Sequence, residues 1–495
     1  MSAESRNDIR VRIAPSPTGT VHLGLARTSL FNWAFARRAG GVFILRMEDT
    51  DHERNTKESE LAIIEGLRWM GIEWDEGPDV EGPYAPYYQS QRIERHREVA
   101  AQLLEGGQAY RCFCTRERLD ELRAGQEVRK ETPRYDRLCA QLDGAEASRR
   151  AAAGEAFTLR FRVPQGETVI EDLVRGHVVF QNEEIDDWVM VRQGGNPTYN
   201  FVVVCDDADM RISHVFRGEE HLVNTPKQVL LYQALGLESP SFGHLPLMLG
   251  KDGKKLSKRH GSVSLSQYRA EGYSRDATIN FLARQGWALD GETEVFSVDE
   301  FVSNFAIGDV SKGGSIFDFE KFAWMSGEYV HAESLDELMA HCAPYMIAAD
   351  YMKAEEIESR ADWYRSAIAL GQERVRLYSE MPYVLAFLFA DDEAVPFDEK
   401  AEKNARKHEN RLADLQAFSE FALPRLVEGV DIDELRAAGK AWIAERGIKF
   451  PQLFQPLRCA LTGQAGGPDL YEIMALLGPG RSRARIESGL GRLGQ

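Results

Sequence analysis

Cysteine is scarce in this sequence, and long apolar runs are missing. The 495 residues include six cysteines, too few for the disulfide framework of a secreted scaffold, so we expect a reducing compartment. No run of about 18 apolar residues occurs, which predicts no membrane-spanning helix. The first residues also lack the apolar segment of a signal peptide. These absences predict a cytoplasmic protein with no membrane partner.

An excess of positive charge is missing as well. The chain has 60 Lys and Arg against 78 Asp and Glu, a formal net charge of −18 at pH 7. Such a balance argues against non-specific adhesion to nucleic acid, so any contact with RNA must use local basic patches. The hydrophobic share of 43% and the charged share of 28% are ordinary for a globular protein. The length suffices for about three domains.

The most informative stretch lies near the N-terminus. Val11-Arg-Ile13 favours a strand, and Pro15 and Pro17 end its ladder. Apolar residues at three- and four-residue spacing predict a helix from Leu23. Because the start of a helix attracts anions, His22 is placed to donate to a phosphate oxygen. A His at this position is equally typical of a helix cap or a core residue.

Charged residues follow two predicted strands. Val42–Met47 reads as a buried parallel strand that runs into Glu48, and a strand from Ile212 presents Arg217 at its end. Ligands of open α/β sheets collect at the carboxyl ends of strands. The forks of Arg12 and Arg217 match carboxylates, which favours a small dicarboxylic substrate, whereas Glu48 suits an ammonium group. A surface salt bridge from Arg217 to the glutamates that follow it is the alternative.

A lysine-rich loop spans Lys251 to Gly261. Its glycines make it mobile, and Lys255 and Lys258 flank Ser257. Attack at an α-phosphorus builds negative charge on phosphates, so catalysis needs cations that engage in the transition state. The loop suits that task, although a solvated charged loop is the other interpretation.

Together these stretches resemble the two signatures of class I aminoacyl-tRNA synthetases. Residues 15–24 have the P-S-P-T-G-x-x-H-x-G form of the HIGH motif, and Lys-Leu-Ser-Lys-Arg at 255–259 resembles the KMSKS loop, both in the forms typical of glutamyl-tRNA synthetases. The resemblance implies activation of L-glutamate by ATP, with Mg²⁺ accompanying ATP, and transfer to the 3′ end of glutamate tRNA. Nothing in the sequence requires a dimer, so we expect a monomer.

The resemblance also implies roles for the matching residues. His22, Lys255 and Lys258 are implied to be catalytic through their contacts with phosphate. The implied ATP site comprises Pro15, Thr18, Gly19, His22, Gly24, Glu220, Met248, Lys255, Ser257 and Lys258. The implied glutamate site comprises Arg12, Ala14, Ser16, Glu48, Tyr199 and Arg217.

The predicted fold class is α/β. We expect a doubly wound parallel-sheet catalytic domain with an α/β insertion, followed by an all-α anticodon-binding region. The expected divisions are 1–95 for the first catalytic half, 96–195 for the insertion that holds the acceptor end, 196–250 for the second half, 251–330 for the KMSKS loop and stem contact, and 331–495 for the helical region. The apolar run at 197–204 is predicted to be strand or helix.

A metal site is a separate question. Cys112, Cys114 and Cys139 match a zinc knuckle that some members of the family carry, but Gln141 stands where the knuckle has His. Structural zinc takes four thiolate or imidazole ligands, and a neutral amide is a poor substitute. We therefore expect no zinc, with three reduced thiols in a remnant loop.

Three other functions remain open. A glutaminyl-tRNA synthetase is the nearest, but paired Arg12 and Arg217 suit a carboxylate better than an amide. A truncated paralogue that modifies a tRNA base would lack residues 330–495. A non-catalytic tRNA-binding paralogue predicts loss of His22, Lys258 or Arg217, and all three are present.

Overall fold

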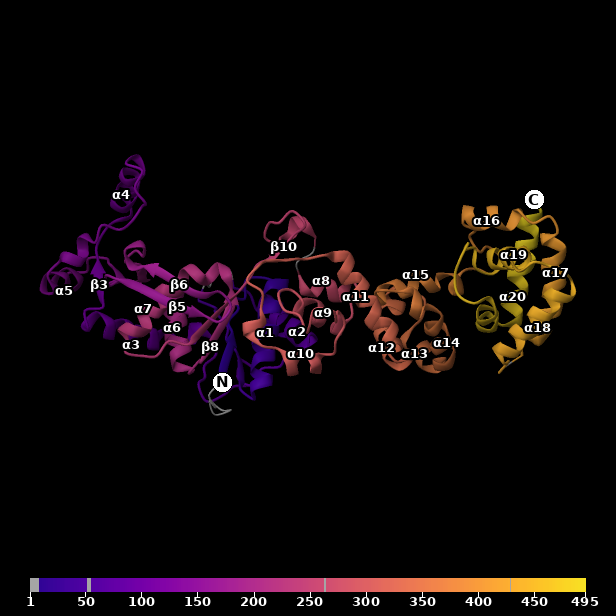
Figure 1. Cartoon of the computed structure of the whole chain (residues 1–495), viewed down its shortest axis with the longest axis horizontal. Helices are drawn as coiled ribbons and strands as arrows, with labels where there is room; N and C mark the ends of the chain where they lie inside the picture. The colour runs from indigo at the N-terminus through magenta and orange to yellow at the C-terminus, as the bar shows by residue number, and fades with distance from the viewer. Residues whose placement is uncertain (1–8, 51–54, 262–263, 428) are drawn as a thin grey trace. The chain divides into compact units, whose positions relative to one another are not determined.

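The computed structural model describes residues 9–50, 55–261, 264–427 and 429–495. These residues fall into two units. The first lies within Met1–Arg269 and Arg275–Phe319, and the second comprises Ala270–Ser274 and Glu320–Gln495. Figure 1 shows the first unit in indigo to pink and the second in orange to yellow.

Parallel strands form the centre of the first unit. Strand β1 (Arg10–Ile13) pairs in parallel with β2 (Val42–Leu45), and β8 (His214–Gly218) pairs in parallel with β9 (Ser241–Leu245). The amide of Ser213 donates to the carbonyl of Arg10 at 2.9 Å, which places the start of β8 beside β1. The parallel sheet predicted from the apolar runs is therefore present, and its strands come from both halves of the catalytic region.

Helices connect and cover these strands. They are α1 (Leu23–Ala39), α2 (Lys57–Trp69), α6 (Tyr199–Asp209) and α7 (Thr225–Ala234). The run at 197–204, left open between strand and helix, becomes α6, because Phe201 and the three valines after it pack into a core with α3 (Ile93–Glu105) and α7. Burial there outweighs the preference of β-branched residues for strands.

Helix α2 turns one apolar residue toward solvent, since Leu61 is 47% exposed. The buried residues are Ile63, Ile64 and Leu67.

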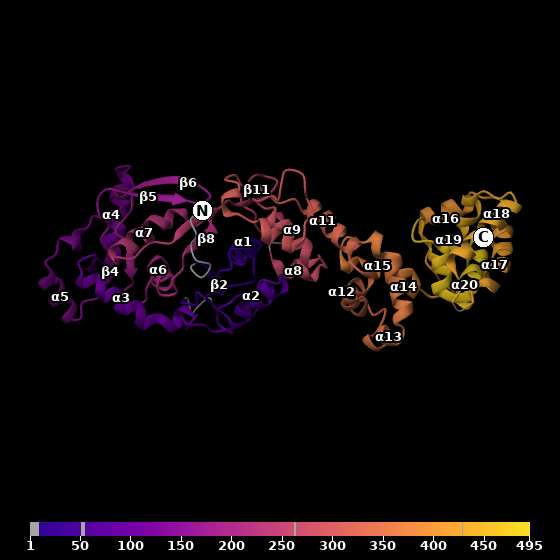
Figure 2. The same ribbon diagram turned by 60° about the horizontal axis from the view of Figure 1, so that its bottom comes forward.

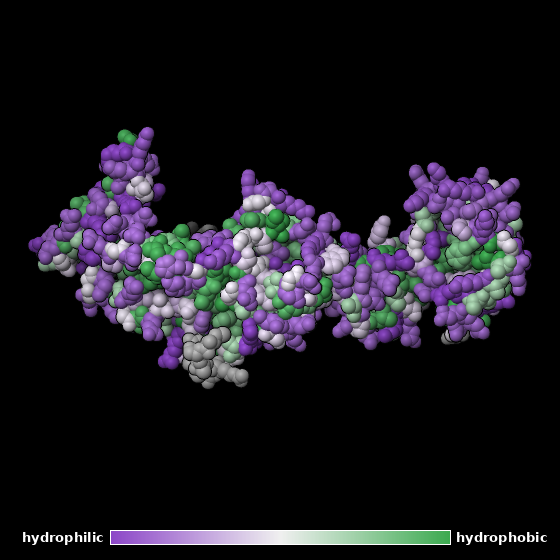
Figure 3. Space-filling view, viewed as in Figure 1, coloured by the Kyte–Doolittle hydropathy of each residue, from purple (hydrophilic) through white to green (hydrophobic). Residues whose placement is uncertain are grey.

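The insertion is built on an antiparallel sheet. Strands β3 (Ala109–Cys112), β4 (Thr158–Phe161) and β7 (Val189–Val191) pair in that order. Helices α3 (Ile93–Glu105), α4 (Arg116–Val128) and α5 (Gly144–Ala152) accompany the sheet. Helix α4 buries none of its residues, and its surface is mainly hydrophilic (Figure 3). Helix α4 is therefore a charged, solvated helix.

A hairpin of the insertion reaches the parallel strands. It consists of β5 (Glu167–Asp172), which the sequence did not reveal, and β6 (Gly176–Gln181). Strand β5 packs against α7 and β9 (Figures 1 and 2). The amide of Leu173, in the hairpin turn, donates to the carbonyl of Phe242 at 2.8 Å.

The remainder of the first unit carries the lysine-rich loop. Strand β10 (Met248–Leu249) precedes the loop and pairs in parallel with β11 (Ser315–Ile316). Helices α8 (Leu265–Ala270), α9 (Arg275–Ala283) and α10 (Val298–Asn304) follow the loop.

The second unit is helical. Its helices are α11 (Phe319–Ala332, which begins at the boundary), α12 (Leu335–Ala348), α13 (Ala354–Ser359), α14 (Ala361–Gly371), α15 (Met381–Leu385), α16 (Glu399–Arg406), α17 (Arg411–Ala422), α18 (Ile432–Glu445), α19 (Phe450–Thr462) and α20 (Leu470–Gly494). One apolar core draws on helices from α11 to α20. Within the described ranges, no helix combines the length and the apolar character that crossing a membrane demands.

Candidate functional site

His22 stands at the strand-to-helix corner. His22 is the N-cap of α1, and its Nδ1 accepts a hydrogen bond from the amide of Leu25 at 3.0 Å. In a neutral imidazole the proton then sits on Nε2, which is free to donate to a phosphate oxygen. Gly24 provides the room, because a Cβ at this position would lie 3.0 Å from His22 Nδ1. The cap and the phosphate donor are therefore compatible interpretations.

The structure brings the two predicted motifs together. His22 forms a β-bridge with Ser264, and the amide of Leu265 donates to the carbonyl of Val21 at 2.8 Å. Lys255 Nζ lies 2.8 Å from Glu220 Oε1. Desolvation and the ammonium of Lys255 lower the pKa of His22. The predicted phosphate-binding groups thus share one region.

Lys258 occupies the far end of the loop. It begins a 3₁₀ turn (Lys258–His260) that Ser257 caps, and its side chain is exposed. It makes no ion pair with the part of the chain that the structure describes. The ammonium is therefore available to an incoming polyanion.

The other residues implied to contact substrates lie around the same corner and strand ends. Pro15 and Met248 are buried, Ala14 is half-buried, and Ser16, Thr18 and Gly19 are exposed between β1 and α1.

Asp207 organises the cationic side of the predicted glutamate site. Its Oδ2 lies 3.0 Å from Arg12 Nη2, and its Oδ1 lies 2.6 Å from Arg46 Nη1. All three side chains are buried. Burial favours protonation of Asp207, but the adjacent guanidinium groups hold its pKa below the ordinary value. In turn, Asp207 holds the pKa of Arg12 above its ordinary value despite burial.

Glu48 is less tightly paired. Its Oε1 lies 3.4 Å from Arg46 Nη2, and burial raises the pKa of Glu48. The pKa of Tyr199, at the start of α6, is raised by burial and then by the charge of Glu48, whereas Arg217 and Arg12 act to lower it. These charges therefore lie within electrostatic range of the Tyr199 hydroxyl. The structure thus gathers three of the predicted glutamate-site residues, Arg12, Glu48 and Arg217, around a fourth, Tyr199.

Arg217 is held by a network of buried neutral groups. Its Nη2 donates to Thr225 Oγ1 at 2.9 Å and to Gln228 Oε1 at 2.8 Å, and its Nε donates to His244 Nε2 at 3.2 Å. Its Nη1 is buried and has no hydrogen-bond partner among the described residues. Burial lowers the pKa of Arg217. A ligand carboxylate would both neutralise this guanidinium and accept from Nη1.

The charged groups of this region have both signs. Asp206, which pairs with Arg92, lies with Asp207 in electrostatic range of Arg46 and Glu48. The feature that suits a substrate carboxylate is therefore the buried Nη1 of Arg217, which has no hydrogen-bond partner among the described residues.

The partners of the predicted residues escaped the sequence analysis. Arg46 lies within an apolar run, and Asp207 follows another. Thr225, Gln228 and His244 carried no local signal. The sequence offered one hint of such partners: a charged residue inside a buried strand, because a buried charge needs a partner.

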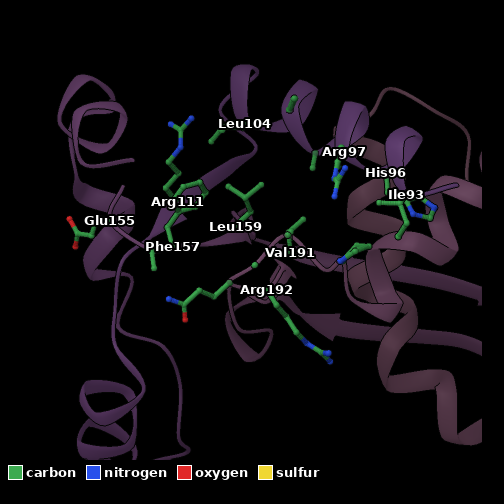
Figure 4. A pocket seen from close by; sticks show the side chains of 17 residues that line it. Ile93, His96, Arg97, Leu104, Arg111, Glu155, Phe157, Leu159, Val191 and Arg192 are labelled. Atoms are coloured by element: carbon green, nitrogen blue, oxygen red, sulfur yellow. The ribbon is translucent and has the colours of Figure 1, made fainter. Parts of the chain in front are cut away.

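The insertion also contains a separate pocket (Figure 4). Its volume is about 400 Å³, and it lies between α3 and the strands β3, β4 and β7. Leu104, Phe157, Leu159 and Val191 give it a largely apolar lining. None of the residues predicted to bind ATP or glutamate lines it.

The three predicted zinc-knuckle thiols do come together. The sulfur atoms of Cys112, Cys114 and Cys139 lie within 4.8 Å of one another, the only such group of potential metal ligands in the described ranges. The Tyr135 hydroxyl lies 3.3 Å from Cys112 Sγ and 3.5 Å from Cys114 Sγ. Gln141 is exposed. The donor set is one ligand short of the four thiolate or imidazole groups that structural zinc takes.

Comparison with protein families gives two matches. Residues 8–324 match the catalytic domain of class I tRNA synthetases (E and Q), and residues 337–490 match an anticodon-binding domain. The described helices of the second unit fall largely within the latter match, in agreement with the expected helical region.

Relatives that match over nearly the whole chain are glutamate-tRNA ligases. A glutamate-tRNA ligase of Natranaerobius thermophilus is 41% identical over 98% of this chain and 99% of its own, and one of Geobacillus stearothermophilus is 43% identical with coverages of 98% and 99%. A crystal structure of a glutamate tRNA ligase from Elizabethkingia meningosepticum, in complex with its amino acid, superposes with a TM-score of 0.88 at 33% identity and covers 98% of this chain and 100% of that one. The chain belongs to the glutamate-tRNA ligase family of class I tRNA synthetases.

Proposed function

We propose that this protein activates L-glutamate with ATP and transfers it to the 3′ end of glutamate tRNA. The observation that carries the proposal is the site around Tyr199. There a buried Arg217 presents an unpartnered Nη1, and Glu48 supplies a carboxylate within electrostatic range. One group suits a substrate carboxylate and the other suits an ammonium group.

The chemistry needs no covalent enzyme intermediate. The α-carboxylate of glutamate attacks the α-phosphorus of ATP, which gives glutamyl-adenylate and releases pyrophosphate. A ribose hydroxyl of the tRNA then displaces AMP. His22, Lys255 and Lys258 bind phosphate oxygens as their charge increases, so catalysis is by positioning and electrostatic stabilisation.

Magnesium fits this scheme as an ion that arrives with ATP. Mg²⁺ is commonly held by substrate phosphates and waters rather than by a dedicated protein cage. The one cluster of potential metal ligands among the described residues is the thiol group, and thiols do not suit Mg²⁺. When bound, the ion would neutralise charge on the phosphates. We also propose that the protein binds no zinc, because the thiol cluster lacks a fourth ligand.

The setting of the reaction is part of the proposal. All six cysteines are free thiols, which favours a reducing compartment such as the cytoplasm. The partners are ATP, L-glutamate and glutamate tRNA, the last engaged by the insertion and by the helical second unit. The protein is proposed to act as a monomer.

The decisive test is ATP-dependent attachment of labelled glutamate to purified tRNA transcripts. Glutamate and glutamine tRNAs are offered separately, unlabelled glutamine serves as competitor, and Lys258→Ala is the inactive control. Charging of glutamate tRNA, unaffected by glutamine, supports the proposal. Charging of neither transcript while tRNA still binds would leave a tRNA-binding paralogue instead.

A further inference from the structure

A residue of the insertion takes part in holding Arg217. Arg217 and His244 are register partners on the parallel strands β8 and β9. His244 Nδ1 lies 2.6 Å from Asp172 Oδ2, and Asp172 is the last residue of β5 in the insertion hairpin. All three side chains are buried, with exposures of 5%, 0% and 4%. They form a hydrogen-bonded chain from the insertion to the amino-acid site.

The first link of this chain is a carboxylate. Asp172 Oδ1 accepts from the backbone amides of Val174, Arg175 and His244 at 3.0, 2.8 and 3.2 Å. Burial opposes ionisation, but the hydrogen bonds from the His244 side chain and the backbone hold the pKa of Asp172 below its ordinary value. A charged acceptor therefore faces His244 Nδ1.

The second link is a neutral imidazole. Burial lowers the pKa of His244, although Asp172 acts to raise it. A neutral ring has one N–H, and the carboxylate of Asp172 fixes that hydrogen on Nδ1. The lone pair is then on Nε2, where the N–H of Arg217 Nε needs an acceptor. The opposite tautomer would set an Nε2–H against the N–H of Arg217 Nε and would leave Thr225 Oγ1, 3.0 Å from Nε2, as the acceptor of that hydrogen.

The third link fixes the plane of the guanidinium. His244 engages Nε, and Thr225 and Gln228 engage Nη2. With two nitrogens bonded, the direction of Nη1 is determined, and Nη1 is the nitrogen without a partner in the described part of the chain. Any change in the His244 tautomer releases one of these two constraints.

We propose that Asp172 and His244 are positioning residues for amino-acid recognition: Asp172 selects the His244 tautomer, and His244 aims Arg217 Nη1 at a substrate carboxylate. The inference rests on the proposed function, which assigns Arg217 to glutamate. It means that the insertion supplies part of the amino-acid site in addition to the parallel strands.

The test is a kinetic double-mutant cycle in the full-length protein. In Asp172→Asn the amide can donate to His244 Nδ1, which moves the imidazole proton to Nε2 and removes the acceptor for Arg217. Loss of a hydrogen bond to a charged group predicts a rise in the KM for glutamate of about tenfold or more. The KM for ATP stays within about twofold, because ATP does not depend on Arg217.

His244→Gln supplies the second arm. The glutamine side-chain oxygen can accept from Arg217 without help from Asp172. In that background Asp172→Asn is expected to change the KM for glutamate by less than about twofold, a non-additivity that a merely structural role would not produce. Should Asp172→Asn not fold, His244→Gln and His244→Ala decide, with only the latter expected to raise the KM.

Glu171→Gln is the matched control. Glu171 precedes Asp172 on β5 but is exposed and pairs with the exposed His177, so its KM values should equal those of the unsubstituted protein. An unchanged KM in a folded Asp172→Asn, or an equal rise in both backgrounds, would overturn the inference. A failure of the unsubstituted protein to charge glutamate would instead overturn the proposed function, so the two failures are distinguishable.

Discussion

Arg46 and Asp207 form a fully buried ion pair, with Arg46 Nη1 2.6 Å from Asp207 Oδ1. Arg46 directly follows β2, and Asp207 lies 161 positions later on α6. The other oxygen of Asp207 accepts from Arg12 on β1. The carboxylate of Asp207 therefore orients guanidinium groups from two neighbouring parallel strands. Both of its oxygens are occupied by these arginines, so the cationic side of the site depends on Asp207.

Replacing Asp207 should be costly. Asp207→Asn keeps the shape but removes the ion-pair partner of Arg12 and leaves Arg46 with only the longer contact to Glu48 in the interior. Breaking a buried ion pair from one side typically costs about 3–5 kcal/mol, and we expect a loss of that order in the free energy of unfolding of the first unit. Urea denaturation measures it, with fluorescence of the unit's tryptophans as the signal.

A matched substitution on the same helix separates the loss of a buried ion pair from the general effect of removing a carboxylate from α6. Asp209→Asn removes a partly exposed carboxylate that pairs with Arg92 and Arg95, and exposed pairs contribute at most about 1 kcal/mol. Equal losses in the two variants would contradict the role given to Asp207.

Asp207 also predicts a dependence of stability on acid. Its pKa in the folded protein is below the ordinary value of 3.8. A carboxyl of this kind adds stability that is fully present above about pH 4 and is lost as the pH falls through the folded-state pKa. The unfolding free energy of the unsubstituted protein should therefore fall more steeply below pH 4 than that of Asp207→Asn. Parallel slopes in the two proteins would count against the assignment.

Glu48 gives a pH effect on activity. Burial raises its pKa above the ordinary 4.5, and only the ionised form attracts the substrate ammonium. The kcat/KM for glutamate should therefore rise with pH as Glu48 ionises. In Glu48→Gln the value should be lower, and this acidic limb should flatten.

The side-chain carboxyl of the substrate also titrates in that range, but it is common to every variant. The difference between the profiles therefore isolates Glu48, and Glu65→Gln, an exposed change on α2, serves as control. A Glu48→Gln profile that keeps the full acidic limb would show that another group controls it.

The sequence could predict features that depend on local patterns, but not contacts between residues that are far apart in the chain. Strand ends, the start of α1 and the order of the two motifs are local patterns, so Arg12, Glu48 and Arg217 could be predicted as site residues without a structure. Asp207 and His244 could not be, because their partners lie elsewhere in the chain and their own neighbours are simply apolar. Strand β5 carried no clear local signal either, since Glu167–Asp172 mixes charged and apolar residues without alternating between them.

The thiol cluster gives a prediction about composition. We expect far less than one zinc per chain in protein purified without chelators, because three thiols and an exposed amide do not complete the ion's shell. Elemental analysis by mass spectrometry measures the metal, with Cys139→Ser as the reference. One zinc per chain, lost in that variant, would show that the cluster is a metal site after all.

Lys258 provides the sharpest test of transition-state stabilisation. Its ammonium is exposed and makes no ion pair with the described residues, so its removal creates no buried defect and should leave stability unchanged. Lys258→Ala should slow adenylate formation by about 100-fold or more, the usual cost of removing one preorganised charge from a developing anion.

The control lies in the same loop. Lys254→Ala removes an equal charge at an exposed position outside the matched motif. Single-turnover measurements with saturating ATP isolate the chemical step from binding, and the KM for glutamate should stay within about twofold in both variants. If Lys254→Ala slowed the step as much as Lys258→Ala, the loop would act through its net charge. If only Lys258→Ala did so, the placement of one ammonium would be what the reaction requires.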